Sequence, residues 1–574
     1  MFLRTGVAAA VLAAALFQAA VVQGAEPASY DLLIRNGMIY DGSGAEPYAG
    51  DVGIKGDRIV YVGPAHAANA AKTVDAKGLA VSPGFINMLS WATESLLIDG
   101  LGQSDLRQGV TLEVMGEGWS MGPLNDRMKK LAVERQGDFK YPIEWTTLGE
   151  YLSLIERRGT AMNVASFVGA TTIRQHELGE ADVDPTPEQL QRMRALVRQA
   201  MEEGALGVGT SLIYPPAAFA ETDELVALTT EAAQCGGSYI SHMRSEGDRL
   251  LESIDELIEI SRRSGAPAEI YHLKQAGRAN WGKLDAAIAK IEAARASGLK
   301  ISADMYAYTA GGTALAASMP PWVQDGGNEA MLERLKDPAT VERVKKEMLQ
   351  PGSNWENLYL HAGPEGVLLA SLTEPSLKPL MGKTVAEVAK MRGVSPEQAV
   401  IDLVLADQGR AAALYFLMSE DNVRRQAAIP WISLGSDAEA SAPEGVFLKS
   451  STHPRAYGNF ARFLGKYVRD EKATSLADAI RRLTSLPASN LGLRDRGSLK
   501  PGMAADVVLF DPATIADHST FAKPMQYATG VRDVFVNGIQ VLKDGEPTGT
   551  KSGRFIKGAG WKGWPGGGAC RPAR

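Results

Sequence analysis

The sequence contains very little cysteine, with only Cys235 and Cys570 among 574 residues. Two cysteines exclude a disulfide-rich scaffold, and no pair is close enough for the CxxC motif of zinc-binding or redox proteins. The chain also lacks an excess of positive charge, because 67 acidic residues outnumber 60 basic ones and give a net charge of −7. A nucleic-acid-binding protein needs a basic surface, so this class is not expected.

Long apolar runs are absent except at the N-terminus. Residues 7–20 are small and apolar apart from Gln18, Arg4 precedes them, and small residues lead to Ala25. The pattern predicts a signal peptide over 1–25 and a periplasmic or secreted protein that has no membrane attachment after cleavage. The alternative, a single membrane anchor, is disfavoured because the run is shorter than the roughly 20 apolar residues that span a bilayer.

Both ends of the remaining chain show the pattern of short β-strands. In the N-terminal part, 26–82, the run Asp31–Arg35 alternates with turn residues. The C-terminal part, 491–556, contains a similar run at Ala505–Phe510. We therefore expect the two ends to pair in one small β-sandwich. The tail, 557–574, contains three consecutive glycines and is expected to be flexible.

Residues 83–490 repeat a strand–helix unit. One helix is predicted from Pro187, directly after the N-cap residue Thr186, to Gly204. The spacing of neighbouring strand candidates matches one βα unit. Eight candidates begin near Val81, Thr111, Met162, Leu206, Gly237, Ala268, Lys300 and Trp431. They predict an α/β fold, a TIM-like (β/α)8 barrel, and the long segment at about 310–430 is expected to be a mostly helical insertion over the barrel mouth.

Two of the seven histidines, His242 and His272, lie at the ends of predicted strands and are 30 residues apart. Consecutive barrel strands would direct both imidazoles toward the same end of the barrel. Asp437 follows the last predicted strand in the same way. Two imidazoles and an oxygen donor are a suitable ligand set for zinc. On spacing alone, the alternative is that these polar groups only satisfy strand ends.

Several longer motifs occur together in this chain. They are Leu32–Gly37, Pro83–Ile86, Ser241–Gly247, Tyr271–Lys274, Gly435–Asp437, His453–Gly458, Leu491–Leu493 and Gly502–Asp506. In this combination the sequence resembles the amidohydrolase superfamily and, within it, the D-aminoacylase (N-acyl-D-amino-acid deacylase) branch. The resemblance covers nearly the whole chain after the signal peptide.

The resemblance implies a metal-dependent barrel, flanked by a β-sandwich, that hydrolyses the linear amide of an N-acyl-D-amino acid. It implies that His242 and His272 are metal ligands and that Asp437 is the catalytic aspartate. The residues implied to hold the substrate carboxylate are Lys274 and Arg455, joined by a tyrosine of Tyr306–Tyr308, of which we favour Tyr306. The alternative for Lys274 and Arg455 is that they are ordinary solvated charges on the barrel rim.

The chain departs from the family pattern at two places, and both concern the metal. After Pro-Gly-Phe-Ile the superfamily usually has an Asp-x-His-x-His run, whereas this chain has Leu89 and Trp91 at the histidine positions. Neither side chain can bind a cation, so the second metal position must be absent or rebuilt. The branch often has a ligating cysteine on the next strand. Here Glu117 is the obvious substitute ligand, the alternative being an ion pair with Arg244 or Lys274.

Three functions remain open at this point. We favour an exported amidase that acts on a small-molecule N-acyl amino acid with one zinc ion, although manganese, iron or cobalt also suit Glu117, His242 and His272. The second hypothesis is hydrolysis of a cyclic amide or imide, and the third is a pseudoenzyme that binds a ligand without turnover. Oligomeric state is not predicted. Outside this site, His453 is expected to position the Arg455 loop, and Cys235 to be a small apolar residue at a helix end.

Overall fold

The computed structural model describes residues 28–352 and 354–571. The expected signal peptide, 1–25, lies outside the described residues. No helix in the described part of the chain is both long and apolar enough to cross a membrane.

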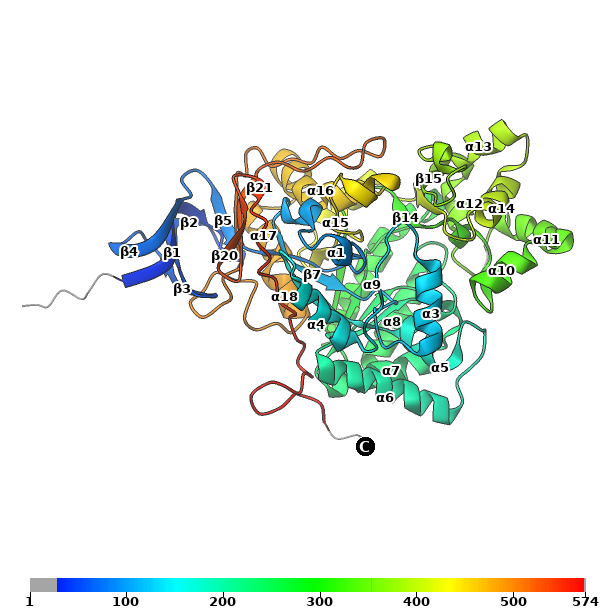
Figure 1. The fold of residues 1–574 in the computed structure, drawn as a ribbon, viewed down its shortest axis with the longest axis horizontal. Coiled ribbons are helices and arrows are strands. Elements are labelled where there is room, and N and C mark those ends of the chain that lie inside the picture. Colours follow the sequence, from blue (N-terminus) through cyan, green and yellow to red (C-terminus); the bar gives the residue numbers. More distant parts are fainter. Residues whose placement is uncertain (1–27, 353, 572–574) are drawn as a thin grey trace, which may run out of the picture.

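One sheet combines strands from both ends of the described chain, as the sequence predicts (Figure 1). Its two halves meet where β5 pairs antiparallel with β18, and Val508 lies opposite Ser82. In spatial order the strands are β21 (Glu546–Pro547), β20 (Ile539–Lys543), β19 (Val531–Val536), β18 (Val507–Phe510), β5 (Ala80–Pro83), β1 (Ala28–Ile39), β2 (Tyr48–Lys55) and β3 (Arg58–Gly63), with β4 (Ala68–Asp75) paired to β1.

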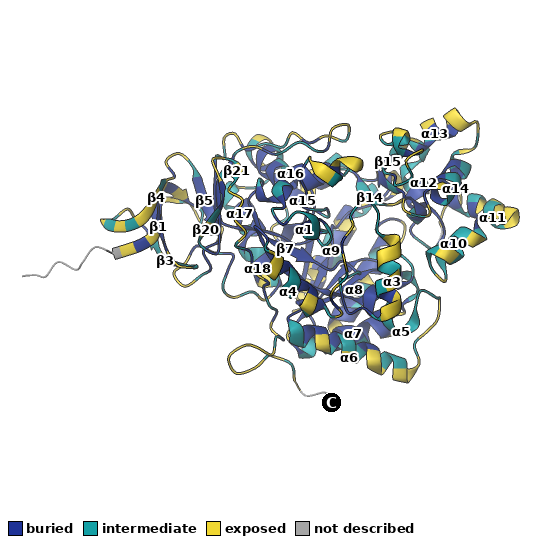
Figure 2. Cartoon of the chain, in the orientation of Figure 1, coloured by how far each residue is buried: buried dark blue, intermediate teal, exposed yellow. Residues whose placement is uncertain are grey.

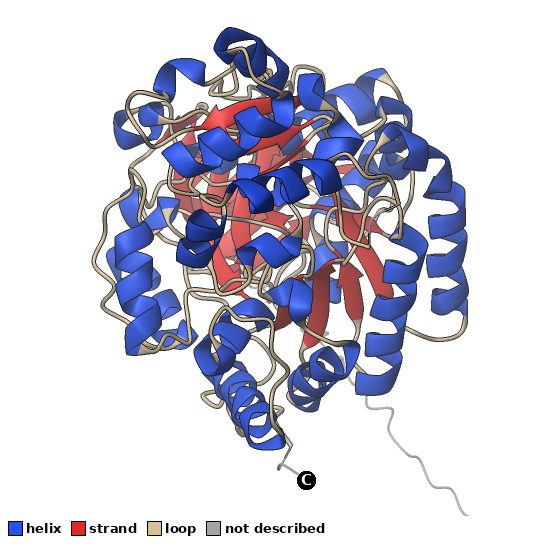
Figure 3. Ribbon diagram, turned by 90° about the vertical axis from the view of Figure 1, so that its right-hand side faces the viewer, coloured by secondary structure: helices blue, strands red, loops and turns tan. Residues whose placement is uncertain are grey.

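The second unit is the predicted barrel, whose parallel strands are surrounded by helices (Figure 3). Its strands are β6 (Phe85–Asn87), β7 (Val110–Met115), β8 (Asn163–Ser166) continued by β9 (Val168–Gly169), β10 (Gly207–Ser211), β11 (Ser238–His242), β12 (Ala268–Ile270), β13 (Ile301–Met305) and β17 (Ile432–Leu434). The Met88 amide donates to the Leu434 carbonyl at 3.1 Å, which links the first strand to the last. The first candidate differs from the prediction, because Val81 belongs to β5 and the barrel begins at Phe85.

The outer helices follow from local sequence signals. In α6 (Pro187–Glu203) the Thr186 side chain caps the first turn, and Gly204 ends the helix at φ 115°. The barrel strands are buried, and the exposed residues of the helices lie on their outer faces (Figure 2). The other helices around the barrel are α4 (Leu148–Arg158), α5 (Ala170–Leu178), α7 (Thr222–Gln234), α8 (Leu250–Ser264), α9 (Leu284–Ala296), α15 (Glu420–Ala427) and α17 (Leu476–Leu483).

The insertion has a hydrophobic core of its own (Figure 1), and its Glu356 contacts the loop after β11 at the carboxyl end of the barrel, where the sequence predicts that the insertion lies. Its helices are α10 (Asn328–Arg334), α11 (Pro338–Met348), α12 (Leu358–Ala362), α13 (Val385–Arg392) and α14 (Pro396–Ala406). It also contains an antiparallel sheet that the sequence analysis missed, in the order β14 (Gly311–Ala314), β16 (Ala412–Tyr415), β15 (Val367–Ser371). These strands are short and come from distant parts of the segment, so no local pattern relates them.

Short helices complete the described chain. They are α1 (Ser95–Ile98), α2 (Gln103–Leu106), α3 (Asp126–Arg135), α16 (Arg455–Arg462), α18 (Ser485–Asn490), the 3₁₀ turns η1 (Ala217–Phe219), η2 (Arg278–Lys283), η3 (Leu315–Ser318), η4 (Pro321–Gln324), η5 (Pro364–Gly366), η6 (Lys378–Leu380) and η7 (Gly445–Lys449), and the π-helix η8 (Phe463–Asp470).

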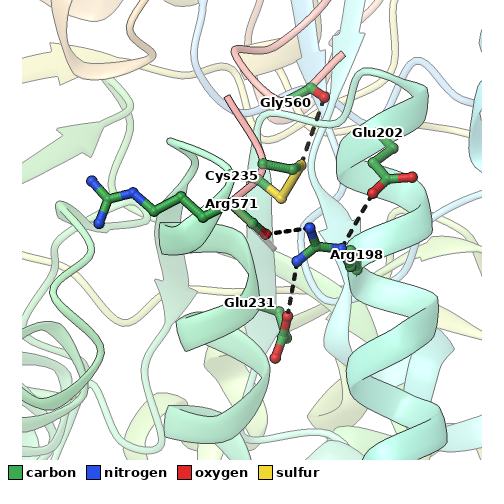
Figure 4. The surroundings of a disulfide bond; sticks show 7 residues. Arg198, Glu202, Glu231, Cys235, Gly560 and Arg571 are labelled. Atoms are coloured by element: carbon green, nitrogen blue, oxygen red, sulfur yellow. Dashed lines mark hydrogen bonds and ion pairs between the residues drawn. A yellow bond between two sulfur atoms is a disulfide. The ribbon is translucent and has the colours of Figure 1, made fainter. Parts of the chain in front are cut away.

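The C-terminal tail differs from the flexible segment that its glycines predict. Cys570 forms a disulfide with Cys235, the residue that follows α7, so Cys235 is not simply a small apolar residue at a helix end (Figure 4). The tail is also held by backbone hydrogen bonds, from Gly558 to Gly204 at 2.9 Å and from Arg571 to Gln234 at 3.1 Å. Composition predicts the freedom of an isolated segment, whereas here a covalent bond and neighbouring helices fix it.

Reduction of this disulfide is expected to destabilise the fold, because it releases a cross-link between two distant parts of the chain. The expected loss is on the order of 2–5 kcal/mol in the free energy of unfolding. The measurement is the thermal midpoint with and without reductant, in the native chain and in the Cys570→Ser variant as the control. The midpoint of the native chain should fall to that of the variant, which should not respond to reductant. An unchanged native midpoint, with both thiols shown to be free, would contradict the prediction.

Candidate metal centre and active site

The candidate ligands lie at the carboxyl ends of three barrel strands, of which β11 and β12 are neighbours. His242 ends β11, His272 follows β12, and Glu117 follows β7. All three side chains are buried, and one donor atom from each lies within 4.8 Å of the others. Asp437, which follows β17, lies beside them, with Oδ2 4.0 Å from Nε2 of His272. The structure therefore brings together the ligands and the aspartate that the sequence analysis proposes.

Two glycines position Glu117. Gly116 and Gly118 have positive φ angles of 104° and 74°. A Cβ atom on Gly116 would lie 2.3 Å from the Phe167 carbonyl oxygen, and one on Gly118 would lie 2.7 Å from the Ser211 Cβ. The Ser211 hydroxyl also donates to the Glu117 carbonyl at 3.1 Å. Only glycine fits on either side, and the tight turn directs the carboxylate into the barrel end.

The backbones of two site residues are strained. His272 and Asp437 have φ angles of 34° and 50°, in the left-handed region that side chains other than glycine rarely adopt. The His272 amide donates to Oδ1 of Asp304 at 2.8 Å, and the Asp437 amide donates to the Leu89 carbonyl at 2.8 Å. Such strain occurs most often at functional sites, where the surrounding contacts hold it in place.

Glu117 faces both imidazoles through a single oxygen. Its Oε1 lies 2.9 Å from Nδ1 of His242 and 3.1 Å from Nε2 of His272. Burial raises the pKa of Glu117, but the hydrogen bonds from the two imidazoles outweigh it and hold the pKa well below its usual range. Burial and the charge of Lys274 favour a lower pKa for His272. The carboxylates of Glu246 and Glu117 have a larger, opposite effect and raise this pKa to about 10. A cation that binds here must therefore displace a proton.

The alternative ion pairs of Glu117 are not formed. Arg244 binds Glu256 at 2.9 Å. Lys274 donates to Oε1 of Glu246 at 2.7 Å. Because both cations have other partners, the Glu117 carboxylate is left to the two imidazoles and to the indole of Trp91, which donates to Oε2 at 2.9 Å.

Glu246 is a site residue that the sequence analysis missed. Its Oε1 lies 3.0 Å from Nδ1 of His272, and its Oε2 lies 3.6 Å from Nε2 of His242. These are the ring nitrogens that face away from Glu117, so one carboxylate lies behind both imidazoles. Burial favours a higher pKa for Glu246. Lys274 and the two histidines have a larger, opposite effect and hold this pKa well below its usual range. Glu246 is in the motif that contains His242. Its contact with both imidazoles depends on how the loop after β11 folds back, which the motif alone does not show.

Asp437 has a separate partner on each carboxylate oxygen. Arg455 binds Oδ2 at 2.8 Å, and the Trp91 indole donates to Oδ1 at 3.1 Å. Burial raises the pKa of Asp437; Arg455 opposes this and Glu117 reinforces it, so that the pKa remains above its usual value. A raised pKa favours a carboxyl group that both accepts and returns a proton.

The expected carboxylate-binding residues converge on one ring. Arg455 Cζ lies 4.5 Å and Lys274 Nζ lies 5.5 Å from the centre of the Tyr306 ring. The Tyr306 hydroxyl and two of the Arg455 nitrogens, Nε and Nη1, are buried and make no hydrogen bond within the described residues. Lys274 is only 3% exposed, so it is not a solvated rim charge. The Tyr306 hydroxyl and the two Arg455 nitrogens are therefore available to bind an anionic ligand, whereas Lys274 already binds Glu246 and adds its charge beside them.

The neighbouring Tyr308 has a different environment. Its hydroxyl donates to Asp517 at 3.1 Å, and its ring lies 4.8 Å from Arg462 Cζ. It therefore connects the barrel to the C-terminal segment, which agrees with the choice of Tyr306 for the site. Nδ1 of His453 accepts a hydrogen bond from the Arg455 amide at 3.0 Å, so His453 positions Arg455, as we expected.

The profile of the amidohydrolase family matches residues 72–542. A D-aminoacylase of Alcaligenes xylosoxydans xylosoxydans is 33% identical over 535 residues, covering 92% of this chain and 97% of that protein. A solved D-aminoacylase, described for one-metal activation and second-metal attenuation of its binuclear centre, is 32% identical with a TM-score of 0.76, covering 92% of this chain and all of that one.

A second solved relative is the N-acyl-D-glutamate deacylase of Bordetella bronchiseptica. It was crystallised with zinc and a phosphonate that mimics the tetrahedral intermediate. It is 29% identical with a TM-score of 0.73, and the match covers 92% of this chain and 100% of that one. Both structures support the barrel that the sequence predicts. The chain belongs to the amidohydrolase family, in its D-aminoacylase branch.

Proposed function

We propose that this protein hydrolyses the linear amide of N-acyl-D-amino acids with one zinc ion held by Glu117, His242 and His272. The observation that carries the proposal is the meeting of these three buried donors beside Asp437. The enzyme class, a hydrolase of carbon–nitrogen bonds other than peptide bonds, agrees with the curated relatives.

The donor set fits a single borderline-soft cation. Two imidazole nitrogens and one carboxylate oxygen are ligands that zinc accepts, and three protein ligands leave a position open for substrate or water. Nδ1 of His272, on the far side of the ring from Glu117, lies 3.0 Å from Oε1 of Glu246 and 2.7 Å from Nζ of Lys274, so these two residues would orient the imidazole for an ion held on the Glu117 side. When bound, the ion supplies a Lewis acid that polarises the scissile carbonyl and activates water.

Asp437 acts as the general acid and base. It is close enough to the ligands to take a proton from the attacking water, and its raised pKa allows it to return that proton to the departing amine. Arg455 and Trp91 each hold one of its oxygens, so the carboxylate is oriented before the substrate binds.

The substrate carboxylate is recognised by Lys274, Tyr306 and Arg455. The unpartnered Arg455 nitrogens can each donate a hydrogen bond to an anionic group, and the Tyr306 hydroxyl can add another. A free carboxylate beside a scissile amide describes an N-acyl amino acid rather than a cyclic imide. The D configuration rests on the relatives, which are a D-aminoacylase and N-acyl-D-glutamate and N-acyl-D-aspartate deacylases.

We also propose that the protein is exported. The N-terminal pattern is that of a signal peptide. The Cys235–Cys570 disulfide adds independent support, because disulfides persist mainly in oxidising compartments such as the bacterial periplasm.

The first test combines metal analysis with an activity panel of N-acyl-D- and N-acyl-L-amino acids. We expect about one zinc ion per chain and turnover of D substrates. Asp437→Asn should keep the metal and lower kcat by about 10²–10⁴-fold, because the proton shuttle is lost. A chain without metal or turnover, or a variant that retains most of its activity, would refute the proposal.

Tyr306→Phe tests the binding of the substrate carboxylate. The variant removes one hydroxyl that has no protein partner in the described structure, so the thermal midpoint should not change. KM should rise about tenfold, because a hydrogen bond to a charged group is lost, and kcat should change little. The matched control is Tyr308→Phe, which loses the bond to Asp517 and should leave KM unchanged. Equal KM values for both variants would contradict this role.

Glu246→Gln tests the carboxylate behind the two imidazoles. Zinc affinity, measured by competition with a chelator, should fall by about 10–100-fold, because the amide is a weaker acceptor for the imidazole N–H. Glu256→Gln removes a similar charge but contacts Arg244 and neither imidazole, so it should bind zinc as the native chain does. Native zinc affinity in Glu246→Gln would show that Glu246 has no part in positioning the ligands.

A further inference from the structure

Trp91 is held in place by the first barrel strand, which continues beyond β6. The Ser90 amide donates to the Val114 carbonyl at 2.9 Å, and the Trp91 amide donates to the Ala438 carbonyl at 2.9 Å. The backbone is thus bonded to the second strand on one side and to the segment after the last strand on the other. This pairing fixes the point at which the indole enters the site.

The two residues that replace the usual histidines have different surroundings. Leu89 is completely buried and belongs to an apolar cluster inside the barrel that includes Phe167 and Tyr271. Trp91 is half-buried, and its Nε1 donates to Oε2 of Glu117 at 2.9 Å and to Oδ1 of Asp437 at 3.1 Å. Leu89 therefore completes the core, whereas Trp91 faces the reacting groups.

The indole nitrogen of Trp91 lies between the carboxylates of Glu117 and Asp437. Two carboxylates that face a common point inside a protein repel each other and favour a cation at that point. Here the point is occupied by an indole N–H, which can donate a hydrogen bond but cannot accept one, and which carries no net charge. The hydrogen bonds offset part of the repulsion between Glu117 and Asp437, and the ring fills space that a second ion and its water ligands would need.

We propose that Trp91 replaces a second cation: its N–H orients Glu117 and Asp437, and its ring keeps the centre to one ion. The inference rests on the proposed one-zinc hydrolase and assigns Trp91 as a positioning residue. Excess metal should then leave activity unchanged, in contrast to the relative described for second-metal attenuation of its binuclear centre.

The test counts zinc ions in the full-length protein, by elemental analysis and titration calorimetry, from equimolar zinc to tenfold excess. The native chain should hold one ion throughout. Trp91→His, which opens the space and offers a ligand, should bind a second ion in excess zinc. Trp91→Phe keeps a ring but loses the N–H, so it should still hold one ion, with kcat lowered about tenfold and KM within twofold of native. Circular dichroism checks that each variant is folded.

The outcomes separate this inference from the proposed function. A native chain that hydrolyses N-acyl amino acids but binds two ions overturns the inference and the one-ion centre, and leaves the proposed hydrolysis in place. A folded Trp91→His variant that stays at one ion overturns the inference alone. If Trp91→His does not fold, an unchanged kcat in Trp91→Phe overturns the orienting role. A native chain that holds one ion in excess zinc but hydrolyses no amide refutes the proposed function and supports exclusion of the second ion.

Discussion

The charges of the site are buried together, so each must be balanced by a neighbour. Three carboxylates, Glu117, Glu246 and Asp437, face two permanent cations, Lys274 and Arg455. The remaining negative charge matches the proton that the raised pKa of His272 allows it to hold. A divalent cation in place of that proton leaves one positive charge in excess, which a substrate carboxylate cancels. The same balance agrees with the divalent metal and the carboxylate-bearing substrate that we propose.

The three carboxylates have different roles because they occupy different sides of the imidazoles. Glu117 is on the side of the rings where we propose that zinc binds, Glu246 is behind both rings, and Asp437 lies near Nε2 of His272, on the same side as Glu117. The insertion contributes to this arrangement. Its Glu356 accepts hydrogen bonds from the Ser245 hydroxyl at 2.6 Å and from the Glu246 amide at 3.1 Å. A segment outside the barrel thus holds the loop that bears the carboxylate behind the ligands.

Replacing a cation by an indole changes the electrostatics of Asp437. A second ion would bind this carboxylate as a ligand and favour its ionised form, whereas the indole N–H gives it only a hydrogen bond. In the mechanism that we propose, proton transfer thus depends on one aspartate held by Arg455 and Trp91 rather than on a pair of ions.

The sequence by itself determined the barrel and most of its site. The βα repeat places strand ends at one edge of the barrel, so the spacing of His242 and His272 brings them together, and the family resemblance identifies Glu117 as the substitute for a ligating cysteine. Only the tertiary structure decided that Glu246 lies behind both imidazoles, that Trp91 bridges two carboxylates and that Cys235 meets Cys570. Local patterns report periodicity and turns, whereas these contacts depend on where loops and a distant tail pack, which no local spacing encodes.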